Sequence, residues 1–419
     1  MENAEMSPDV PPYVSADLNR SRNLLIALLF FGSIINYIDR QVLSLLKPTL
    51  QLEFHWSDSQ FAHFASVSQL AAASALIFVG WLVDRFGVRV AYGVAVAVWS
   101  FAAMGHAFAA GVGQFVAARF VLIAAETVST PAGVKSAAQF LPIKQRSFAL
   151  GIGNTAPNIG NILAPLTVVP FAAYFGWKSA FIATGALGFI WIVFWIIGTR
   201  KLVPVADAVP HSGGNPINWG ELLSDRKTWA IAGAKAITDM FWWFFTFWLP
   251  DLFHKVFHLS QSQLIGPTAL AFTLAAFGAL SSGALFPALL ARGRTVNAAR
   301  KQSLVFYALI ILPIPFALTA ASPWIAATII GIGLFAHQGF STNIFGLTAD
   351  AVPARRVAST IAVGAIAGNI AGFAIQEVTG KLLSSGIGYG PLFIAASVAY
   401  LLATLWVHIM IPKIVPAQT

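Results

Sequence analysis

Two long apolar runs of the sequence each contain a pair of ionisable residues that could do chemistry. Asp39 and Arg40 are adjacent in the first run, and Arg119 and Glu126 lie in a later one. The latter two are seven residues apart, about two helical turns, so a helix would present a cation and a carboxylate on one face. Ionisable side chains are costly in a bilayer and are typical of pathways for solutes or protons. The pattern therefore favours passage of an anion and a proton.

Each of these residues also has a structural interpretation. Asp39 and Arg40 could be a buried pair that locks helices together, and Arg119 could lie near a membrane surface and snorkel. Glu126 lies among small residues, where function is the better interpretation. A further pair, Lys235 and Asp239, is four residues apart on one helical face, and we expect it to be structural.

The elements that must position these residues are membrane-spanning helices. Hydrophobic residues make up 57% of the 419 and charged residues only 10%, against roughly a quarter in a soluble domain. Apolar runs of about 20 residues, enough to cross a bilayer as a helix, recur along the chain and do not alternate as barrel strands would. We predict an all-α polytopic protein with twelve spans, at 23–46, 60–83, 88–110, 114–140, 147–174, 178–198, 228–252, 262–290, 302–321, 324–348, 356–383 and 390–412.

Charge in the loops predicts the orientation. Lys and Arg gather in alternate loops, including residues 85–89, 144–146, 200–201 and 292–301, whereas the opposite loops carry Lys47, Lys178, Lys255 and Lys381. The positive-inside rule then places both termini in the cytoplasm, and we expect the protein to lie in the inner (cytoplasmic) membrane. The net charge of +9 is thus a topology signal, and scattered basic residues argue against nucleic-acid binding.

The spans divide into two equal halves. The polar, Gly/Pro-rich stretch 199–227 separates a predicted six-helix bundle at 23–198 from a second at 228–412, with cytoplasmic tails at 1–22 and 413–419. The halves echo one another, because RSFALGIGNTAPNIGNILAP around Asn158 resembles RRVASTIAVGAIAGNIAG around Asn369. Repeated halves with a site between them are a recurrent transporter plan.

The predicted loop after the second span carries a specific motif. Gly80, Asp84, Arg85, Gly87 and Arg89 combine an acid, two arginines and turn glycines, which could hold a helix end in one conformation and release it in another. This loop resembles the gating motif of the major facilitator superfamily, and that resemblance implies two pseudo-symmetric six-helix bundles.

A narrower resemblance covers essentially the whole chain. Asn36 to Arg40, Glu126 with Pro131, and Ile237 to Trp243 are similar to motifs of the anion:cation symporter family, most of all to its hexuronate transporters. This implies import of galacturonate or glucuronate by proton symport through alternating access. It also implies that Glu126 and Asp39 carry the proton and that Arg40 and Arg119 serve the substrate site. The residue types themselves add flat faces from Tyr37, Trp242 and Trp243, and amides from Asn158, Gln338, Asn343 and Asn369.

The residue types fit those roles, although other interpretations stay open. Amides offer donors and acceptors to hydroxyls, but they also bridge helices in membrane bundles. We expect no metal and no cofactor other than the coupling proton, membrane lipid as the surroundings, and a monomer. The spans show no catalytic triad or metal-spaced cluster, which argues against an enzyme. A sensor of the acid, or a symporter of an aldonate, tartrate-like or aromatic acid, is the alternative.

Overall fold

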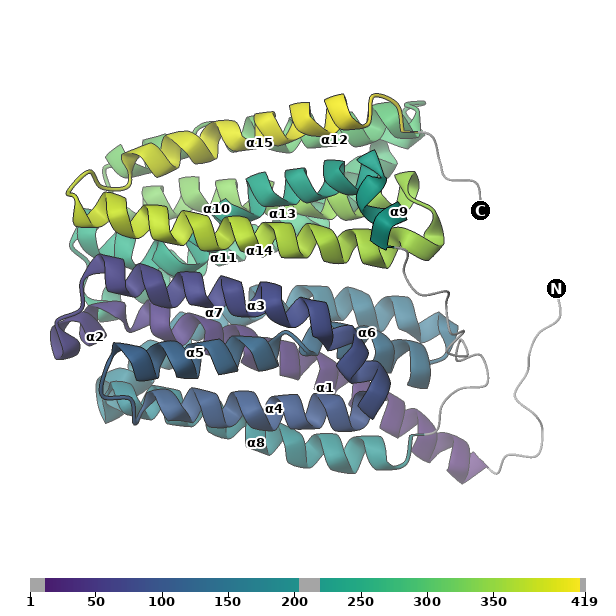
Figure 1. Cartoon of the computed structure of the whole chain (residues 1–419), viewed down its shortest axis with the longest axis horizontal. Coiled ribbons are helices and arrows are strands. Elements are labelled where there is room, and N and C mark those ends of the chain that lie inside the picture. The colour runs from purple at the N-terminus through teal and green to yellow at the C-terminus, as the bar shows by residue number, and fades with distance from the viewer. Residues whose placement is uncertain (1–11, 203–218, 415–419) are drawn as a thin grey trace.

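The computed structural model describes residues 12–202 and 219–414, and within them the chain is entirely helical apart from turns. Long helices lie side by side along one direction (Figure 1). The start of α1 and the end of α15 lie at one end of the bundle, here called the termini end, and α2 lies at the other, the α2 end. The protein is a polytopic membrane protein, because eleven of the described helices are long and apolar enough to cross a bilayer.

The first half of the chain supplies eight helices, and the second half supplies the rest. The first-half helices are α1 (Pro12–Leu45), α2 (Lys47–Phe54), α3 (Asp58–Phe86), α4 (Val88–His106), α5 (Val112–Glu126), α6 (Ser129–Phe140), α7 (Ile143–Phe175) and α8 (Trp177–Arg200). The second-half elements are α9 (Trp219–Ser224), α10 (Arg226–Phe257), η1 (Gln261–Leu264), α11 (Ile265–Ala291), α12 (Val296–Ile310), η2 (Ile314–Thr319), α13 (Pro323–Ala351), α14 (Ala354–Ser384) and α15 (Gly390–Met410).

Most of the predicted spans fall on these helices, and two segments extend beyond the prediction. Helix α1 begins at Pro12, inside the predicted tail 1–22, because a helix can continue through polar residues once it has left the hydrocarbon. Helix α9 lies inside the predicted link 199–227. Residues 1–11, 203–218 and 415–419 of the predicted tails and link lie outside the described residues.

Helix α10 covers the predicted span 228–252 but is absent from the eleven apolar candidates among the described residues. It carries Lys235, Asp239 and Asp251, and these polar groups lower its mean hydropathy. The side chains of Lys235 and Asp251 are buried inside the protein. Helix α10 packs against α14 and α15, so its charges lie against protein and not against lipid.

The predicted span 114–140 is broken in the structure into α5 and α6. Thr127 and Val128 form the turn between them, and Pro131 explains it, because proline has no N–H to bond the carbonyl four residues earlier. Side chains satisfy the backbone at the break: Asn36 Nδ2 donates to the Glu126 carbonyl at 3.3 Å, and Ser129 Oγ donates to it at 2.7 Å. The break therefore fixes Glu126 at the last position of α5.

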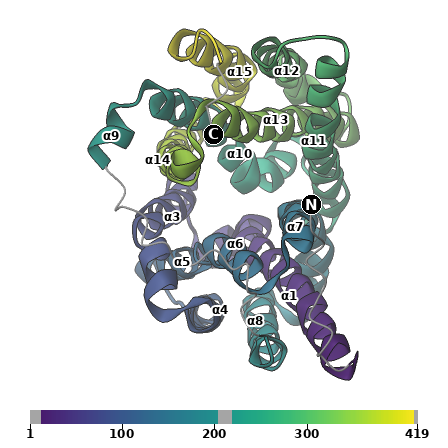
Figure 2. The same ribbon diagram turned by 90° about the vertical axis from the view of Figure 1, so that its right-hand side faces the viewer.

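Two seams join the halves of the bundle. Helix α3 packs on α14, and α7 packs on α11, as the view along the helices shows (Figure 2). Small residues permit the close approach, since a Cβ added at Gly380 of α14 would lie 2.3 Å from the Cβ of Ala62 on α3. Helices α1 and α10, one from each half, also touch.

Candidate functional site

A cavity of about 370 Å³ lies between the two halves. The first half contributes α1, α3, α4, the break between α5 and α6, and α7, while the second half contributes α10, α13 and α14. Along α1 its lining runs from Arg40 back to Leu29, that is, toward the start of the helix, which lies at the termini end. Its polar and aromatic lining includes Ser33, Asn36, Tyr37, Arg40, Tyr92, Glu126, Thr130, Trp243, Phe345 and Asn369.

An ion pair lies in the wall of this cavity. Arg40 Nε donates to Glu126 Oε2 at 2.8 Å, with the Arg40 side chain 11% exposed and that of Glu126 fully buried. The guanidinium lies over two rings, 5.4 Å from the centre of Tyr37 and 5.7 Å from that of Trp243. The second carboxylate oxygen, Glu126 Oε1, is buried without a hydrogen-bond partner among the described residues. The site thus presents a cation held by aromatic faces and an acid with one oxygen unused.

Arg119 lies behind this pair and outside the cavity lining. It is fully buried, so it does not snorkel toward a membrane surface. Its Nε donates to Ser68 Oγ and one Nη to the Arg40 carbonyl, both at 2.9 Å. Arg119 therefore ties α5 to α1 and α3 and fixes the backbone that carries Arg40.

Asp39 is also buried and outside the cavity lining, although it neighbours Arg40 in sequence. Successive residues of a helix point about 100° apart, so Asp39 and Arg40 face different surroundings. Neither carboxylate oxygen of Asp39 has a hydrogen-bond partner among the described residues. The alternative interpretation of Asp39 and Arg40 as a pair that locks helices together is not what the structure shows, because Arg40 pairs with Glu126.

The predicted amides occupy two kinds of place. Asn369 lines the cavity. Gln338 Nε2 donates to Asn158 Oδ1 at 3.2 Å, which bridges α13 and α7 across the halves. Asn343 Nδ2 donates to Ser282 Oγ at 2.8 Å, between α13 and α11, so it lies within the second half.

The two predicted tryptophans point in different directions. Trp243 lines the cavity opposite Arg40. Trp242 is buried and stacks on the ring of His337 with centroids 5.0 Å apart. Adjacent positions on α10 therefore serve the cavity and the packing of α10 against α13.

The motif loop connects α3 to α4 at the termini end. Gly87 takes φ of 74°, a conformation that side-chain-bearing residues rarely adopt, and it allows the sharp reversal. Asp84 Oδ1 accepts from Lys135 Nζ at 2.7 Å, and Arg89 donates to the Leu202 carbonyl. These contacts tie the loop to α6 and to the end of α8, within one half. Gly80 and Arg85 are exposed.

Comparison of the sequence with models of known protein families identifies the family of this chain. The family model described as Major Facilitator Superfamily matches residues 29–376, most of the chain. The chain belongs to the Major Facilitator Superfamily. It is a transporter and not an enzyme, as its family and its relatives named as transporters indicate.

Two of the curated proteins that this chain resembles are named as transporters of sugar acids. The chain is 27% identical over 398 residues to the hexuronate transporter of Escherichia coli strain K12, covering 91% of this chain and 92% of that protein. It is 28% identical over 399 residues to the probable L-galactonate transporter of the same strain, covering 90% and 86%. The crystal structure of a D-xylose-proton symporter superposes with a TM-score of 0.73 at 13% identity, covering 94% and 98%.

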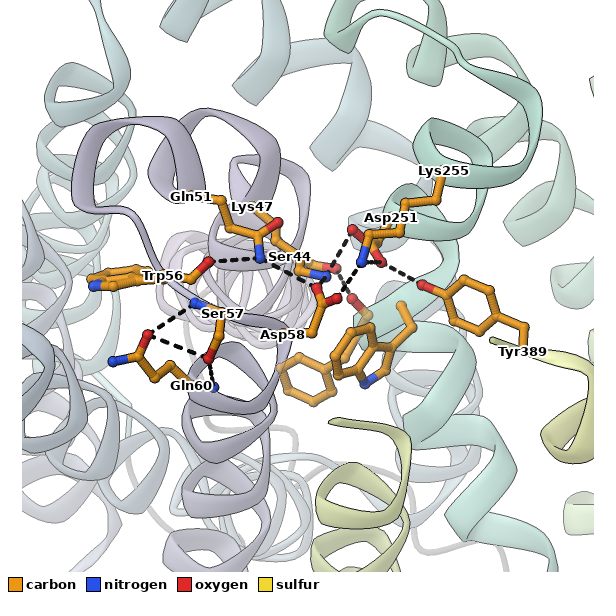
Figure 3. A network of polar contacts seen from close by, with 12 residues as sticks. Ser44, Lys47, Gln51, Trp56, Ser57, Asp58, Gln60, Asp251, Lys255 and Tyr389 are labelled. Atoms are coloured by element: carbon orange, nitrogen blue, oxygen red, sulfur yellow. Dashed lines mark hydrogen bonds and ion pairs between the residues drawn. The ribbon is translucent and has the colours of Figure 1, made fainter. Parts of the chain in front are cut away.

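Sequence reasoning missed one charged cluster in this Major Facilitator Superfamily protein. Lys47, Asp58, Asp251 and Lys255 form a network at the α2 end, between α2 and α3 of one half and α10 of the other (Figure 3). The fully buried Lys47 Nζ lies 2.8 Å from Asp58 Oδ1 and 2.7 Å from Asp251 Oδ1. Lys255 pairs with Asp58 and lies 3.6 Å from Asp251, and Tyr389 OH donates to Asp251. The one available signal was the i, i+4 spacing of Asp251 and Lys255.

Further contacts close the α2 end around this network. Ser44 Oγ donates to the Phe247 carbonyl at 2.5 Å, which joins α1 to α10. Thr49 of α2 bonds Gln261 of η1, and Lys47 lies 4.3 Å from the ring centre of Trp248. The halves are thus bound together by charge and hydrogen bonds at the end opposite to the one toward which the cavity extends. We call the four charged residues the α2-end latch.

Proposed function

We propose that the protein imports a monovalent sugar acid, of the hexuronate class that includes galacturonate and glucuronate, together with protons. The observation that carries the proposal is the Arg40–Glu126 ion pair in the wall of a cavity between the two halves. Relatives named for hexuronate and galactonate transport support the substrate class. Rocking of the two halves about the cavity would expose it to each side in turn.

The ion pair offers a route to coupling. A substrate carboxylate and the Glu126 carboxylate would compete for the same Arg40 guanidinium, because Glu126 holds its Nε at 2.8 Å. When Glu126 accepts a proton it loses its charge, and Arg40 becomes available to the substrate. When substrate and proton leave, the pair re-forms. Binding of the anion and of the proton would then favour one another.

Some of the other candidate residues would contact the substrate, and the rest would support them from outside the cavity lining. Tyr37, Trp243 and Asn369 line the cavity and would contact the sugar ring and its hydroxyls. Arg119 would hold the Arg40 backbone, and Asp39 would be a second proton site. Asn158 and Gln338 would act where their bond joins the halves, while Trp242 and Asn343 would support α10 and α13.

The loop charges assign sides to the two ends of the bundle. With Lys and Arg of the loops at the termini end, that end would face the cytoplasm of a bacterial inner membrane. The cavity lining extends toward that end, while the α2-end latch joins the halves on the other side. The structure would then correspond to an inward-open state, and the motif of Asp84 and Arg89 would close the cytoplasmic side in the alternate state.

Uptake into vesicles tests the proposal. Purified protein in liposomes, given an inward proton gradient, should accumulate labelled galacturonate or glucuronate. Glu126→Gln should lose gradient-driven accumulation but still exchange internal for external substrate. Glu53→Gln is the control, since Glu53 is an exposed acid on α2 and should transport as the wild type does.

Two outcomes would count against the proposal. Absence of uptake of either acid by folded wild-type protein would remove the hexuronate assignment, and the same assay with aldonates would test the second candidate, which the resemblance to the probable L-galactonate transporter favours. Accumulation by Glu126→Gln equal to that of the wild type would remove Glu126 from coupling.

A further inference from the structure

A second cation–carboxylate pair lies in the opposite half, on the same face of α10 as Trp243. Lys235, Asp239 and Trp243 are spaced i, i+4 and i+8, so they line up along one side of the helix. Lys235 Nζ lies 2.8 Å from Asp239 Oδ2. Trp243 lines the cavity, and Asp239 and Lys235 lie one and two turns from it along α10, nearer to the termini end and just behind the lining residues.

Neighbours of the pair also line the cavity. Phe345, a lining residue, has its ring centre 4.9 Å from Lys235 Nζ, and Ser341 accepts from that Nζ at 3.1 Å. On the other side, a Cβ added at Gly368 would lie 2.6 Å from Asp239 Oδ2, so the carboxylate lies directly against the α14 backbone. The next residue along α14 is Asn369, which lines the cavity.

Two acceptor atoms in this region are buried and unused. Asp239 Oδ1 and Asn369 Oδ1 have no hydrogen-bond partner among the described residues. Asn369 is only 8% exposed, and its Nδ2 is already committed to the Ala365 carbonyl. Leaving a buried acceptor without a hydrogen bond costs about 1–3 kcal/mol, and more for a charged group. A ligand that supplied two donors would relieve that cost.

We propose that Asp239 and Asn369 bind the hydroxyl groups of the sugar acid, at the end of the ligand remote from its carboxylate. Lys235 is a positioning residue that holds Asp239 Oδ2 and so turns Oδ1 toward the ligand. The first half then binds the carboxylate through Arg40 and the second half reads the hydroxyls, so a plain carboxylic acid engages one half only. This inference rests on the proposed function and adds the residues that select a polyhydroxylated acid.

Combining deoxygenated ligands with protein variants tests whether Asp239 and Asn369 bind the hydroxyl groups. Binding of galacturonate and of its 2-, 3- and 4-deoxy analogues to full-length protein in nanodiscs is measured by calorimetry. In the wild type, loss of the contacted hydroxyl should weaken Kd by roughly tenfold to a hundredfold, the effect of one hydrogen bond to a charged group. In Asp239→Asn, Lys235 retains the amide oxygen and a neutral NH₂ donor replaces the charged acceptor Oδ1, so the same deletion should raise Kd by only about twofold to tenfold.

Matched variants keep the outcome clear. Asp350→Asn alters an aspartate that is also paired at 2.8 Å, with Arg300, but lies in the last turn of α13, and it should keep the full wild-type discrimination. Asn369→Leu, of similar volume, should lose discrimination at a hydroxyl, and it serves if Asp239→Asn does not fold. Equal discrimination by wild type, Asp239→Asn and Asn369→Leu at all three positions would overturn the inference alone. Wild-type protein that binds no hexuronate would overturn the proposed function as well.

Discussion

Replacing Lys47 by Met should open the α2 end of the protein. Lys47 is fully buried and holds Asp58 of its own half at 2.8 Å and Asp251 of the other half at 2.7 Å. Methionine keeps the length and apolar contacts of the side chain, which lies over Phe61 and Trp248, but leaves Asp251 Oδ1 without its cation. The closed state should therefore lose stability relative to a state in which water reaches the latch.

The size of the shift follows from burial. Removing one partner of a buried ion pair costs about 3–5 kcal/mol, because the other charge is left uncompensated. In a hydrated open state the same pairs are worth at most about 1 kcal/mol. The difference, roughly 2–4 kcal/mol, corresponds to a shift of about thirtyfold to several hundredfold toward opening.

Distance measurement between spin labels gives a direct assay. The chain contains no cysteine, so labels can be introduced without background. Glu53 on α2 and Ser262 on η1 are exposed, belong to different halves and lie beside the α2-end latch. Pulsed dipolar spectroscopy of Glu53→Cys/Ser262→Cys should show one short distance in the wild-type background and a longer, dominant one with Lys47→Met.

Charge removal elsewhere at the same end provides the control. Lys178 is an exposed lysine at the start of α8, and Lys178→Met should leave the distance distribution unchanged. If Lys47→Met gives the same distribution as the wild type, while thermal melting shows that it is folded, then the latch does not hold the halves together and the reasoning is refuted.

Three further variants check other parts of the structure. Gly160→Val places a Cβ 2.7 Å from that of Tyr37 and should lower stability by about 1–3 kcal/mol in thermal unfolding, whereas Gly283→Ala, with open space around it, should not; equal melting of the two would contradict the α1–α7 packing. Asp84→Asn removes an exposed ion pair and should cost less than about 1 kcal/mol in the same assay, while transport slows; a larger loss of stability would point to a structural role. Arg40→Lys keeps the charge but loses the planar group between Tyr37 and Trp243, so Kd for substrate should rise roughly tenfold, and an unchanged Kd would argue against stacking as a determinant.

Hydropathy allowed the helices to be predicted well, because contact with lipid imposes a strong requirement on composition. The predicted span 88–110 corresponds to Val88–His106, and 390–412 corresponds to Gly390–Met410. The break after Glu126 was not predicted, although Pro131 is a local signal for it. The predicted span 228–252 contains the charged residues of α10. The structure accommodates Lys235 and Asp251 there because their side chains are buried against other helices and do not contact lipid.

The candidate site could be predicted as a set of residues but not as a geometry. Tyr37, Arg40, Glu126, Trp243 and Asn369 meet at one cavity, and their roles in transport remain predictions. Rotation of a helix about its axis decides which polar side chains face inward, and helices surrounded by apolar neighbours show little periodicity to reveal it.

The clearest failure of sequence reasoning is the α2-end latch. Lys47 and Asp251 are far apart in the chain, and their contact exists only because the two halves pack together. Nothing local to either residue indicates the partner. The same holds for Asn158 and Gln338, whose bond crosses the halves.

The α2-end latch has a composition that bears on the electrical behaviour of the protein. Each half contributes one lysine and one aspartate, Lys47 with Asp58 and Lys255 with Asp251, and each of these two pairs also lies within its own half at 2.8 and 3.6 Å. When the halves separate, each lysine keeps an aspartate of its own half as a neighbour. Each half of the latch is electrically neutral, so opening it carries no net charge through the membrane field. A dependence of transport on membrane voltage would therefore not arise from opening the latch itself.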